Sequence, residues 1–159
     1  DLDAGAKIVI TAGGITRFHS VQDGLAFVTE PSVVFVHDGV RCLVTQELIR
    51  RCYEQAIEKG SAIPAVAATD SIRIVEDNMH SVADRSKVRI IQTPQTFLSA
   101  LLLPAYKATY KEAFTDEATV VEASGKKVFL IEGDHENIKI TRPADLLIAG
   151  KILTKRSFL

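Results

Sequence analysis

Charged and polar side chains follow four predicted strands, at the point where each strand ends. They are Arg17 and Ser20 after Gly13-Gly14, Asp38 and Arg41 in VHDGVR, Thr69 to Ser71, and Asn137 and Lys139 after Glu132-Gly133. Ligands of open parallel sheets bind beyond the carboxyl ends of the strands, so we expect these groups to converge on one edge of a sheet. Any one of them alone is typical of a solvent-exposed strand end, whereas four together favour a binding site.

Asp38 lies two residues after the apolar run Val33–Val36, which predicts the most buried strand of the chain. A carboxylate in that place is costly to desolvate unless a cation or hydrogen-bond donors accompany it. It is either a turn aspartate or a ligand for a hard cation such as Mg²⁺, which takes one or two carboxylates plus substrate phosphates. Arg41 suits bidentate phosphate recognition or is a surface arginine, and Gly39 lets the backbone turn and a ligand approach closely. Arg85 and Lys139 offer further positive charge.

Other common sites are missing from the sequence. His37 and Asp38 are neighbours in a strand and therefore point to opposite faces, so no catalytic dyad is expected. No histidine cluster has metal-ligand spacing, and neither G-x-G-x-x-G nor G-x-x-x-x-G-K occurs. A nucleotide bound by this chain would need an unconventional phosphate cradle or one supplied from elsewhere.

Composition narrows the class of protein. The 159 residues suit one domain, and the net charge of -1 gives no basic field for nucleic acid. No apolar run approaches the length of about 18 residues that a membrane span needs, so no membrane partner is expected. Cys42 and Cys52 lack metal spacing and are expected to be reduced thiols of a cytoplasmic protein.

Periodicity predicts alternating strands and helices. Strands are expected at 6–14, 32–38, 61–68 and 127–133, and helices at 17–30, 45–60, 97–110, 115–125 and 141–156. Thr45, Thr115 and Thr141 are expected N-caps, and Gly60 is an expected helix stop. Pro64 predicts an edge or bulge position for its strand. The alternation indicates an α/β sheet with mainly parallel strands.

The segment 68–92 departs from this alternation. Residues 71–77 and 87–93 each alternate polar and apolar side chains. That period predicts an antiparallel hairpin or arm inserted into the domain.

The motifs occur in one order along nearly the whole chain: GGITRFHSV, VHDGVR, TDSIR, DRS, QTPQTF, FTDEA and EGDHENIKITRPADL. As an ordered set they closely resemble the 2-C-methyl-D-erythritol 4-phosphate cytidylyltransferase family. The resemblance implies a three-layer, Rossmann-like nucleotidyltransferase sheet, mostly parallel, with a protruding β-arm that forms a homodimer. Residues 1–159 would then be a single domain with 68–92 as the dimerisation arm.

The resemblance also implies an activity in non-mevalonate isoprenoid synthesis. The family joins CTP to methylerythritol phosphate and releases pyrophosphate, with Mg²⁺ or another divalent cation. By this resemblance, roles follow for ten residues of the sequence. Asp38 would bind the metal and, with Gly39, the nucleotide, and Gly14 and Ser20 would border the cytosine. The residues that would contact the sugar phosphate are Arg41, Thr93, Thr115 and Lys139. Ser71 and Arg85 would reach into the partner subunit's site. Arg85 and Lys139 match the pair that positions the sugar phosphate for attack on CTP.

The sequence departs from the family pattern in places. The glycine-rich A-A-G-x-G-x-R-M type loop that cradles the triphosphate is missing, so we expect a truncated domain without its first strand–helix unit and without transfer activity. Cys42 stands where the family usually has proline, and Glu136 stands where some members have aspartate, which leaves a second metal ligand open. Two alternatives remain: a ribitol 5-phosphate cytidylyltransferase, and a non-catalytic dimerisation module on the same scaffold.

Overall fold

The computed structural model describes residues 7–157, which contain five α-helices, one short 3-10 helix and seven strands. The elements are α1 (Arg17–Leu25), β1 (Val33–Val36), α2 (Gln46–Lys59), β2 (Ser61–Ala67), β3 (Ile72–Glu76), β4 (Met79–Ala83), the short 3-10 helix η1 (Arg85–Lys87), β5 (Arg89–Ile91), β6 (Gln95–Leu98), α3 (Ser99–Ala105), α4 (Glu117–Ala123), β7 (Leu130–Glu132) and α5 (Pro143–Arg156). The predicted α/β class is confirmed.

The apolar spacing and the two terminal residues of helix α2 agree with its predicted position. Leu48, Cys52 and Ala56 recur at helical spacing and are all buried. The Thr45 hydroxyl accepts a hydrogen bond from the Leu48 N–H at 3.2 Å, and Gly60 ends the helix in the left-handed conformation at φ 89°. Both predicted boundaries of α2 are therefore confirmed.

The central sheet has the strand order β1-β6-β2-β5, and β7 also pairs with β2. Strand β6 runs antiparallel to both β1 and β2, β5 runs antiparallel to β2, and β7 runs parallel to β2. The three strands β1, β2 and β7 thus share one direction, as expected, but the chain returning from the arm inserts between β1 and β2 in the opposite direction. The sheet is mixed rather than mostly parallel.

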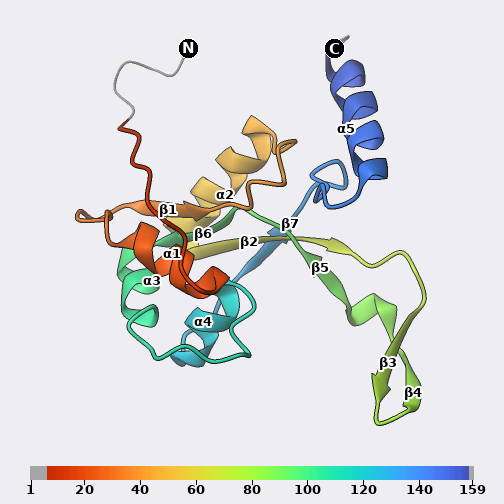
Figure 1. Cartoon of the computed structure of the whole chain (residues 1–159), viewed down its shortest axis with the longest axis horizontal. Helices are drawn as coiled ribbons and strands as arrows, with labels where there is room; N and C mark the ends of the chain where they lie inside the picture. The colour runs from red at the N-terminus through yellow and green to blue at the C-terminus, as the bar shows by residue number, and fades with distance from the viewer. Residues whose placement is uncertain (1–6, 158–159) are drawn as a thin grey trace.

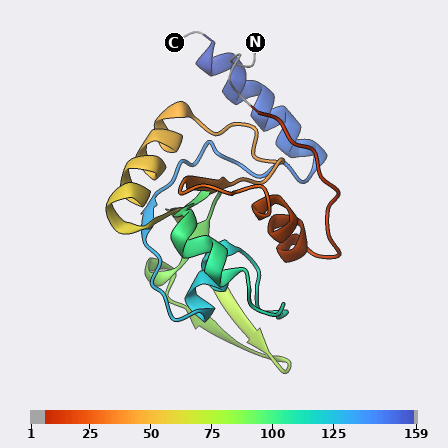
Figure 2. The same cartoon turned by 90° about the vertical axis from the view of Figure 1, so that its left-hand side faces the viewer.

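Helices cover both faces of this sheet (Figure 1). On one face, α1, α3 and α4 pack around Phe97 and Ile63. On the other, α2 packs against Ala62. The predicted three layers are present, and Figure 2 shows α5 standing beside them rather than within them. None of the helices within residues 7–157 is long and apolar enough to cross a membrane.

The first predicted strand is wrong. Residue 6 lies outside the described residues, and residues 7–14 form neither a strand nor a helix. Ile8 and Ile10 are mostly exposed. Their apolar character predicted a buried strand, but no neighbouring strand pairs with them among the described residues.

The burial of β1 was also overestimated. Val33–Val36 is only half-buried, because β1 pairs with β6 alone in the described sheet and lies at its edge. The most buried strand is β2, whose first six residues are all buried between two neighbours.

Pro64 does not lie at an edge either. It sits inside β2, opposite the interruption between β5 and β6, and its carbonyl accepts from the Gln92 N–H at 2.8 Å. Because regular pairing is broken at that point, the missing N–H of proline removes no ladder hydrogen bond.

Helices α1, α3, α4 and α5 have boundaries that differ from the predictions. α3 spans Ser99–Ala105 rather than 97–110. α1 ends at Leu25, directly after Gly24. α4 is capped by Asp116 rather than Thr115, and α5 begins after Arg142 rather than Thr141. Asp116 is the N-cap of α4 because its carboxylate accepts a hydrogen bond from the Thr119 N–H at 2.9 Å.

An arm is present between residues 68 and 92 as a β3–β4 hairpin that extends away from the sheet (Figure 1). The prediction of 87–93 as its second strand is wrong, because β5 pairs with β2 in the central sheet. Asp77 and Asn78 form the turn of the hairpin, both with positive φ, as two-residue hairpin turns of type I′ require. Strand β5 then carries the chain back to the central sheet.

The Gly60 cap yields a prediction for stability. Gly60→Ala should lower the free energy of unfolding by about 1 kcal/mol, because only glycine adopts a positive φ without cost. Gly150→Ala is the matched control: this glycine lies inside α5 with open space around it, and alanine there should raise stability by up to about 1 kcal/mol. Chemical denaturation measures both, and a loss of stability of equal size in the two variants would contradict the assignment of the cap.

Candidate active site

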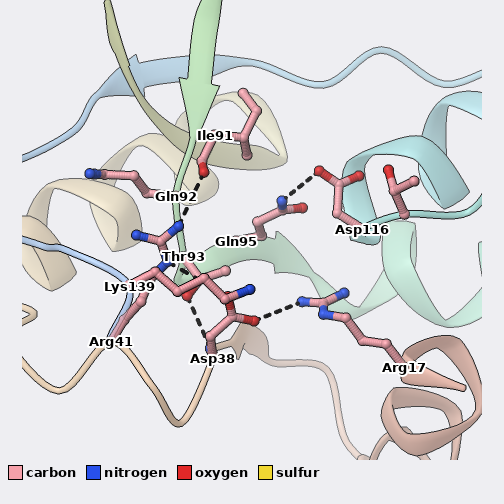
Figure 3. A pocket seen from close by; sticks show the side chains of 10 residues that line it. Arg17, Asp38, Arg41, Ile91, Gln92, Thr93, Gln95, Asp116 and Lys139 are labelled. Atoms are coloured by element: carbon pink, nitrogen blue, oxygen red, sulfur yellow. Dashed lines mark hydrogen bonds and ion pairs between the residues drawn. The ribbon is translucent and has the colours of Figure 1, made fainter. Parts of the chain in front are cut away.

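Asp38 lies two residues beyond β1, with three cationic side chains around its carboxylate (Figure 3). The Lys139 Nζ is 3.3 Å away, the Arg17 guanidinium 3.5 Å and the Arg41 Nε 3.6 Å. Burial raises the pKa of Asp38, whereas the Lys139 ammonium and then the two guanidinium groups lower it. The net pKa lies below its ordinary value, so Asp38 is ionised at neutral pH.

The backbone at Asp38 is fixed by Thr93, from the junction between β5 and β6. The Thr93 hydroxyl accepts from the Asp38 N–H at 3.0 Å and also contacts the His37 Nδ1 at 3.0 Å. The His37 Nε2 donates to the Arg41 carbonyl at 3.0 Å. Both ring nitrogens of His37 are thus engaged away from the Asp38 carboxylate, and the prediction of no His–Asp dyad is confirmed.

Arg41 is buried by the same turn. Its guanidinium donates to the Asn137 carbonyl at 2.8 Å and to the Ile91 carbonyl at 3.4 Å. Burial lowers the pKa of Arg41, and the Asp38 carboxylate opposes this effect. Two backbone carbonyls and one carboxylate therefore set the orientation of this arginine before any ligand binds.

Lys139 lies on the loop between β7 and α5, and hydrogen bonds beyond that of Arg41 to Asn137 tie the loop to the site. The Asn137 side chain donates to the Thr93 carbonyl at 2.9 Å, and the Ile140 N–H donates to the Val40 carbonyl at 2.8 Å. Gln92 donates to the Asp134 carbonyl at 2.8 Å. Lys139 itself is half-exposed, so its ammonium remains available to a ligand.

The opposite wall comes from the start of α4. Gln95 of β6 donates to the Asp116 carboxylate at 2.9 Å and accepts from the Ala118 N–H at 2.9 Å. This bridge holds Thr115 and Asp116 beside the cavity.

These walls enclose a cavity of about 170 Å³. Its lining residues are Arg17, Asp38, Arg41, Ile91, Gln92, Thr93, Gln95, Thr115, Asp116 and Lys139. Five of the ten residues predicted from the sequence are among them. The cavity is small, polar and rich in cations, which suits a small anionic ligand.

Three of the four residues predicted to border a nucleotide, Ser20, Asp38 and Gly39, line a second hollow beside the first, and Gly14 does not. Arg17, Asp38 and Lys139 line both the hollow and the cavity. Gly14 donates its N–H to the Ser20 hydroxyl at 3.0 Å. A β-carbon on Gly14 would lie 2.3 Å from the His19 side chain, so this position requires glycine.

Ser71 and Arg85 lie apart from the cavity. Both are exposed, Ser71 at the start of the arm and Arg85 in η1, where it donates to the Thr69 carbonyl at 2.7 Å. Within one chain the arm does not bring either residue to the cavity lining.

Several lining residues were not predicted. Gln92 lies in the junction after β5 and Gln95 begins β6. Both are neutral, and nothing in their spacing distinguishes them from core polar residues. Arg17 was expected among the groups at the sheet edge, but no role was predicted for it. Its partner, Glu117, was assigned to the first turn of a helix, where acidic residues are common at the surface, yet it is fully buried.

Within residues 7–157, no three histidine, cysteine or acidic side chains come together in a way that could hold a metal ion. Asp38 is the carboxylate at the centre of the cavity. It could therefore hold a cation only together with oxygen ligands from a substrate, as Mg²⁺ often is held.

Comparison with known proteins adds to this geometry. Residues 1–155 match the model of the 2-C-methyl-D-erythritol 4-phosphate cytidylyltransferase (IspD) family. The chain belongs to this family. Nearly every described residue, including the cavity and the arm, falls within the match.

Two curated relatives carry the name of this cytidylyltransferase. The protein from Bacteroides fragilis is 44% identical over 147 residues, covering 92% of this chain and 67% of that protein. The protein from Bacteroides thetaiotaomicron is 48% identical over 145 residues, covering 91% of this chain and 66% of that protein. The chain thus spans about two thirds of the length of these relatives.

Solved structures of the family agree with the fold. The cytidylyltransferase from Thermus thermophilus superposes with a TM-score of 0.81 at 33% identity, covering 95% of this chain and 79% of that one. The Francisella tularensis enzyme gives a TM-score of 0.80 at 34% identity, covering 91% and 71%. These names favour methylerythritol phosphate over the ribitol alternative.

The low pKa of Asp38 predicts a pH-dependent contribution to stability. A carboxylate whose pKa is depressed by folding stabilises the protein above its unfolded pKa, and this stabilisation is lost as the pH falls through the folded pKa. Asp38→Asn should therefore be less stable than the wild type at pH 7, and the difference should shrink below the ordinary carboxyl pKa of 3.8.

Denaturant unfolding between pH 7 and pH 2 measures this difference. Asp23→Asn, an exposed change on α1, is the control and should alter stability little at pH 7. A wild-type advantage over Asp38→Asn that is the same at both ends of the pH range would contradict the cationic cluster.

Proposed function

We propose that this chain forms the polyol-phosphate part of a cytidylyltransferase site, in a protein that transfers a cytidylyl group from CTP to 2-C-methyl-D-erythritol 4-phosphate. The observation that carries the proposal is the cavity in which Arg17, Arg41 and Lys139 surround one carboxylate at the end of β1. Membership of the family and the names of the relatives support the same substrate.

The residues of the cavity suit a phosphate monoester. The Lys139 ammonium is accessible, and Thr93 and Thr115 place hydroxyl groups on the same walls. Arg41 also lines the cavity and adds positive charge to it, with its guanidinium oriented by two backbone carbonyls. Together they would hold the sugar phosphate and reduce the repulsion between its oxygens and those of CTP.

The reaction needs little side-chain chemistry. The attacking group is a phosphate oxygen of the polyol phosphate, which is already ionised; it forms a bond to the α-phosphorus of CTP, and pyrophosphate leaves. Positioning and charge neutralisation then supply most of the rate. This agrees with the engagement of both His37 nitrogens elsewhere, since no general base is required.

We include Mg²⁺ or another divalent cation in the proposal. Asp38 would hold it, with phosphate oxygens of the substrates completing its ligands. A bound cation would supply neutralisation of the phosphate charge. Ser20 and Gly39 would border the nucleotide in the adjoining hollow, and Gly14 would support Ser20 through its N–H. The free thiols of Cys42 and Cys52 accord with a reducing, cytoplasmic setting.

The arm is proposed to form a homodimer. Ile74 and Met79 are exposed on one face of the hairpin, and Val75 and Val82 on the other. A two-stranded hairpin with apolar side chains on both faces is not stable by itself in water, so these faces need a partner. A second copy would also bring Ser71 and Arg85 to a cavity that they do not reach in their own chain.

Binding of the polyol phosphate tests the proposal. We expect calorimetry to show binding of 2-C-methyl-D-erythritol 4-phosphate to the wild type, and Lys139→Gln to weaken it about tenfold, since a hydrogen bond to a charged group contributes roughly 1.5–3 kcal/mol. Lys126→Gln, an exposed change between α4 and β7, should have no effect. Tighter binding of ribitol 5-phosphate than of methylerythritol phosphate would show that the substrate assignment is wrong.

The 159-residue chain alone should release negligible pyrophosphate from CTP and methylerythritol phosphate. The 159 residues contain no glycine-rich loop for the triphosphate, so the negative charge of the CTP triphosphate is left without that source of neutralisation. A coupled pyrophosphate assay, with the Bacteroides fragilis relative as positive control, measures this. Turnover by the chain that is comparable to that of the relative would contradict the expectation.

The dimer is testable through the arm. Light scattering should give a dimeric mass for the wild type and a monomeric mass for the double variant Val75→Glu/Val82→Glu, because two charges cannot be buried unpaired in an apolar interface. Lys126→Glu controls for the added negative charge. A monomeric wild type, or a double variant that stays dimeric, would count against the arm as the interface.

A further inference from the structure

Arg17 joins two carboxylates that lie in different environments. It is the first residue of α1, and its guanidinium forms a two-pronged ion pair with Glu117, the first residue of α4. The same guanidinium lies 3.5 Å from Asp38 in the cavity. One side chain therefore connects the helix layer beneath the sheet to the carboxylate at the centre of the site.

The Glu117 end of this connection is rigid. The Glu117 side chain is fully buried, and the Tyr106 hydroxyl donates to its Oε1 at 3.2 Å. Phe18, next to Arg17, stacks on Tyr106 and Phe114 with ring centroids 4.8 and 5.6 Å apart. The start of α1 is thus held by aromatic packing, and the buried carboxylate sets the direction of the guanidinium.

The other side of the Arg17 guanidinium faces the cavity, where Asp38 is its partner at 3.5 Å. A guanidinium carries five N–H donors in a fixed plane, and Glu117 occupies only one edge of it. The side chain remains 38% exposed and lines both the cavity and the adjoining hollow. Arg17 therefore lies at the boundary between the proposed polyol-phosphate and nucleotide subsites. Arg41 lines the cavity but not the hollow, so it does not share this position.

A purely structural role would not require this arrangement. A buried carboxylate needs a cationic partner, but a partner serving only Glu117 need not reach the cavity. Arg17 also extends to the Asp38 carboxylate at 3.5 Å, beside Lys139 and Arg41. Three cationic side chains lie in one cavity beside the carboxylates of Asp38 and Asp116. An anionic ligand would compete with these carboxylates for cations that are already in place.

We propose that Arg17 is a phosphate-binding residue shared by the two subsites, and that Glu117 is its positioning residue. The inference rests on the proposed function for the identity of the ligand. Its geometry, an arginine fixed on one edge by a buried carboxylate and facing a cationic cavity on the other, requires only that the ligand carry a phosphate.

The test separates binding from folding by replacing the ion pair as a whole. Arg17→Gln alone leaves Glu117 buried without a partner and is expected to be less stable. The double variant Arg17→Met/Glu117→Leu exchanges the pair for apolar side chains of similar size, a change that proteins often tolerate without loss of stability. Thermal unfolding verifies that the double variant is folded, and Arg50→Gln, an exposed arginine of α2, controls for the lost charge.

Calorimetry with two probes, methylerythritol phosphate and inorganic pyrophosphate, then measures affinity. The folded double variant should bind both at least about tenfold more weakly than the wild type, as the loss of a charge-assisted hydrogen bond implies. Arg50→Gln should bind as the wild type does. Glu117→Gln should weaken binding in the wild-type background but not further when combined with Arg17→Met, because a positioning residue acts only through the group it positions.

Each outcome bears on the inference. Wild-type affinity for both probes in the folded double variant overturns it and leaves the proposed function standing. Arg17-dependent binding of pyrophosphate without binding of methylerythritol phosphate supports the role of Arg17 and overturns the proposed substrate. A wild type that binds neither probe overturns both.

Discussion

The attraction between one carboxylate and three cations organises the site. Arg17 comes from α1, Arg41 from the turn after β1, and Lys139 from the loop after β7, and each lies within 3.6 Å of the Asp38 carboxylate. Without Asp38 these three groups would repel one another in a partly buried cavity, where charges are screened less than in water. Asp38 therefore holds together elements that are far apart in the sequence.

The same balance prepares the site for phosphate. The cations are held in place before a ligand arrives, by Glu117 for Arg17 and by two backbone carbonyls for Arg41. A site whose donors are already oriented loses less conformational freedom on binding. In a reaction where the substrate supplies its own ionised nucleophile, such positioning is the main contribution that the protein can make.

The sequence predicted those parts of the fold whose signals are local. The stripe and caps of α2, the arm between 68 and 92, and the clustering of Asp38, Arg41, Thr93, Thr115 and Lys139 could all be inferred from periodicity, motif order and the rule that ligands bind at strand ends. The direction of β6 and the lack of pairing at residues 7–14 could not be inferred from the sequence. The hydrophobic pattern of a segment does not specify which strand will lie beside that segment in the sheet. The ion pair between Arg17 and Glu117 joins residues 100 positions apart, and neither residue type reveals its burial in advance.

A crystal structure of the chain with 2-C-methyl-D-erythritol 4-phosphate tests the central claim most directly. We predict that the phosphate lies in the cavity beside Asp38, with its oxygens about 3 Å from the Lys139 ammonium and from at least one arginine guanidinium of the cluster, the usual length of a charge-assisted hydrogen bond. A phosphate bound away from this cavity, with Arg17, Arg41 and Lys139 still paired only to Asp38, would contradict the claim.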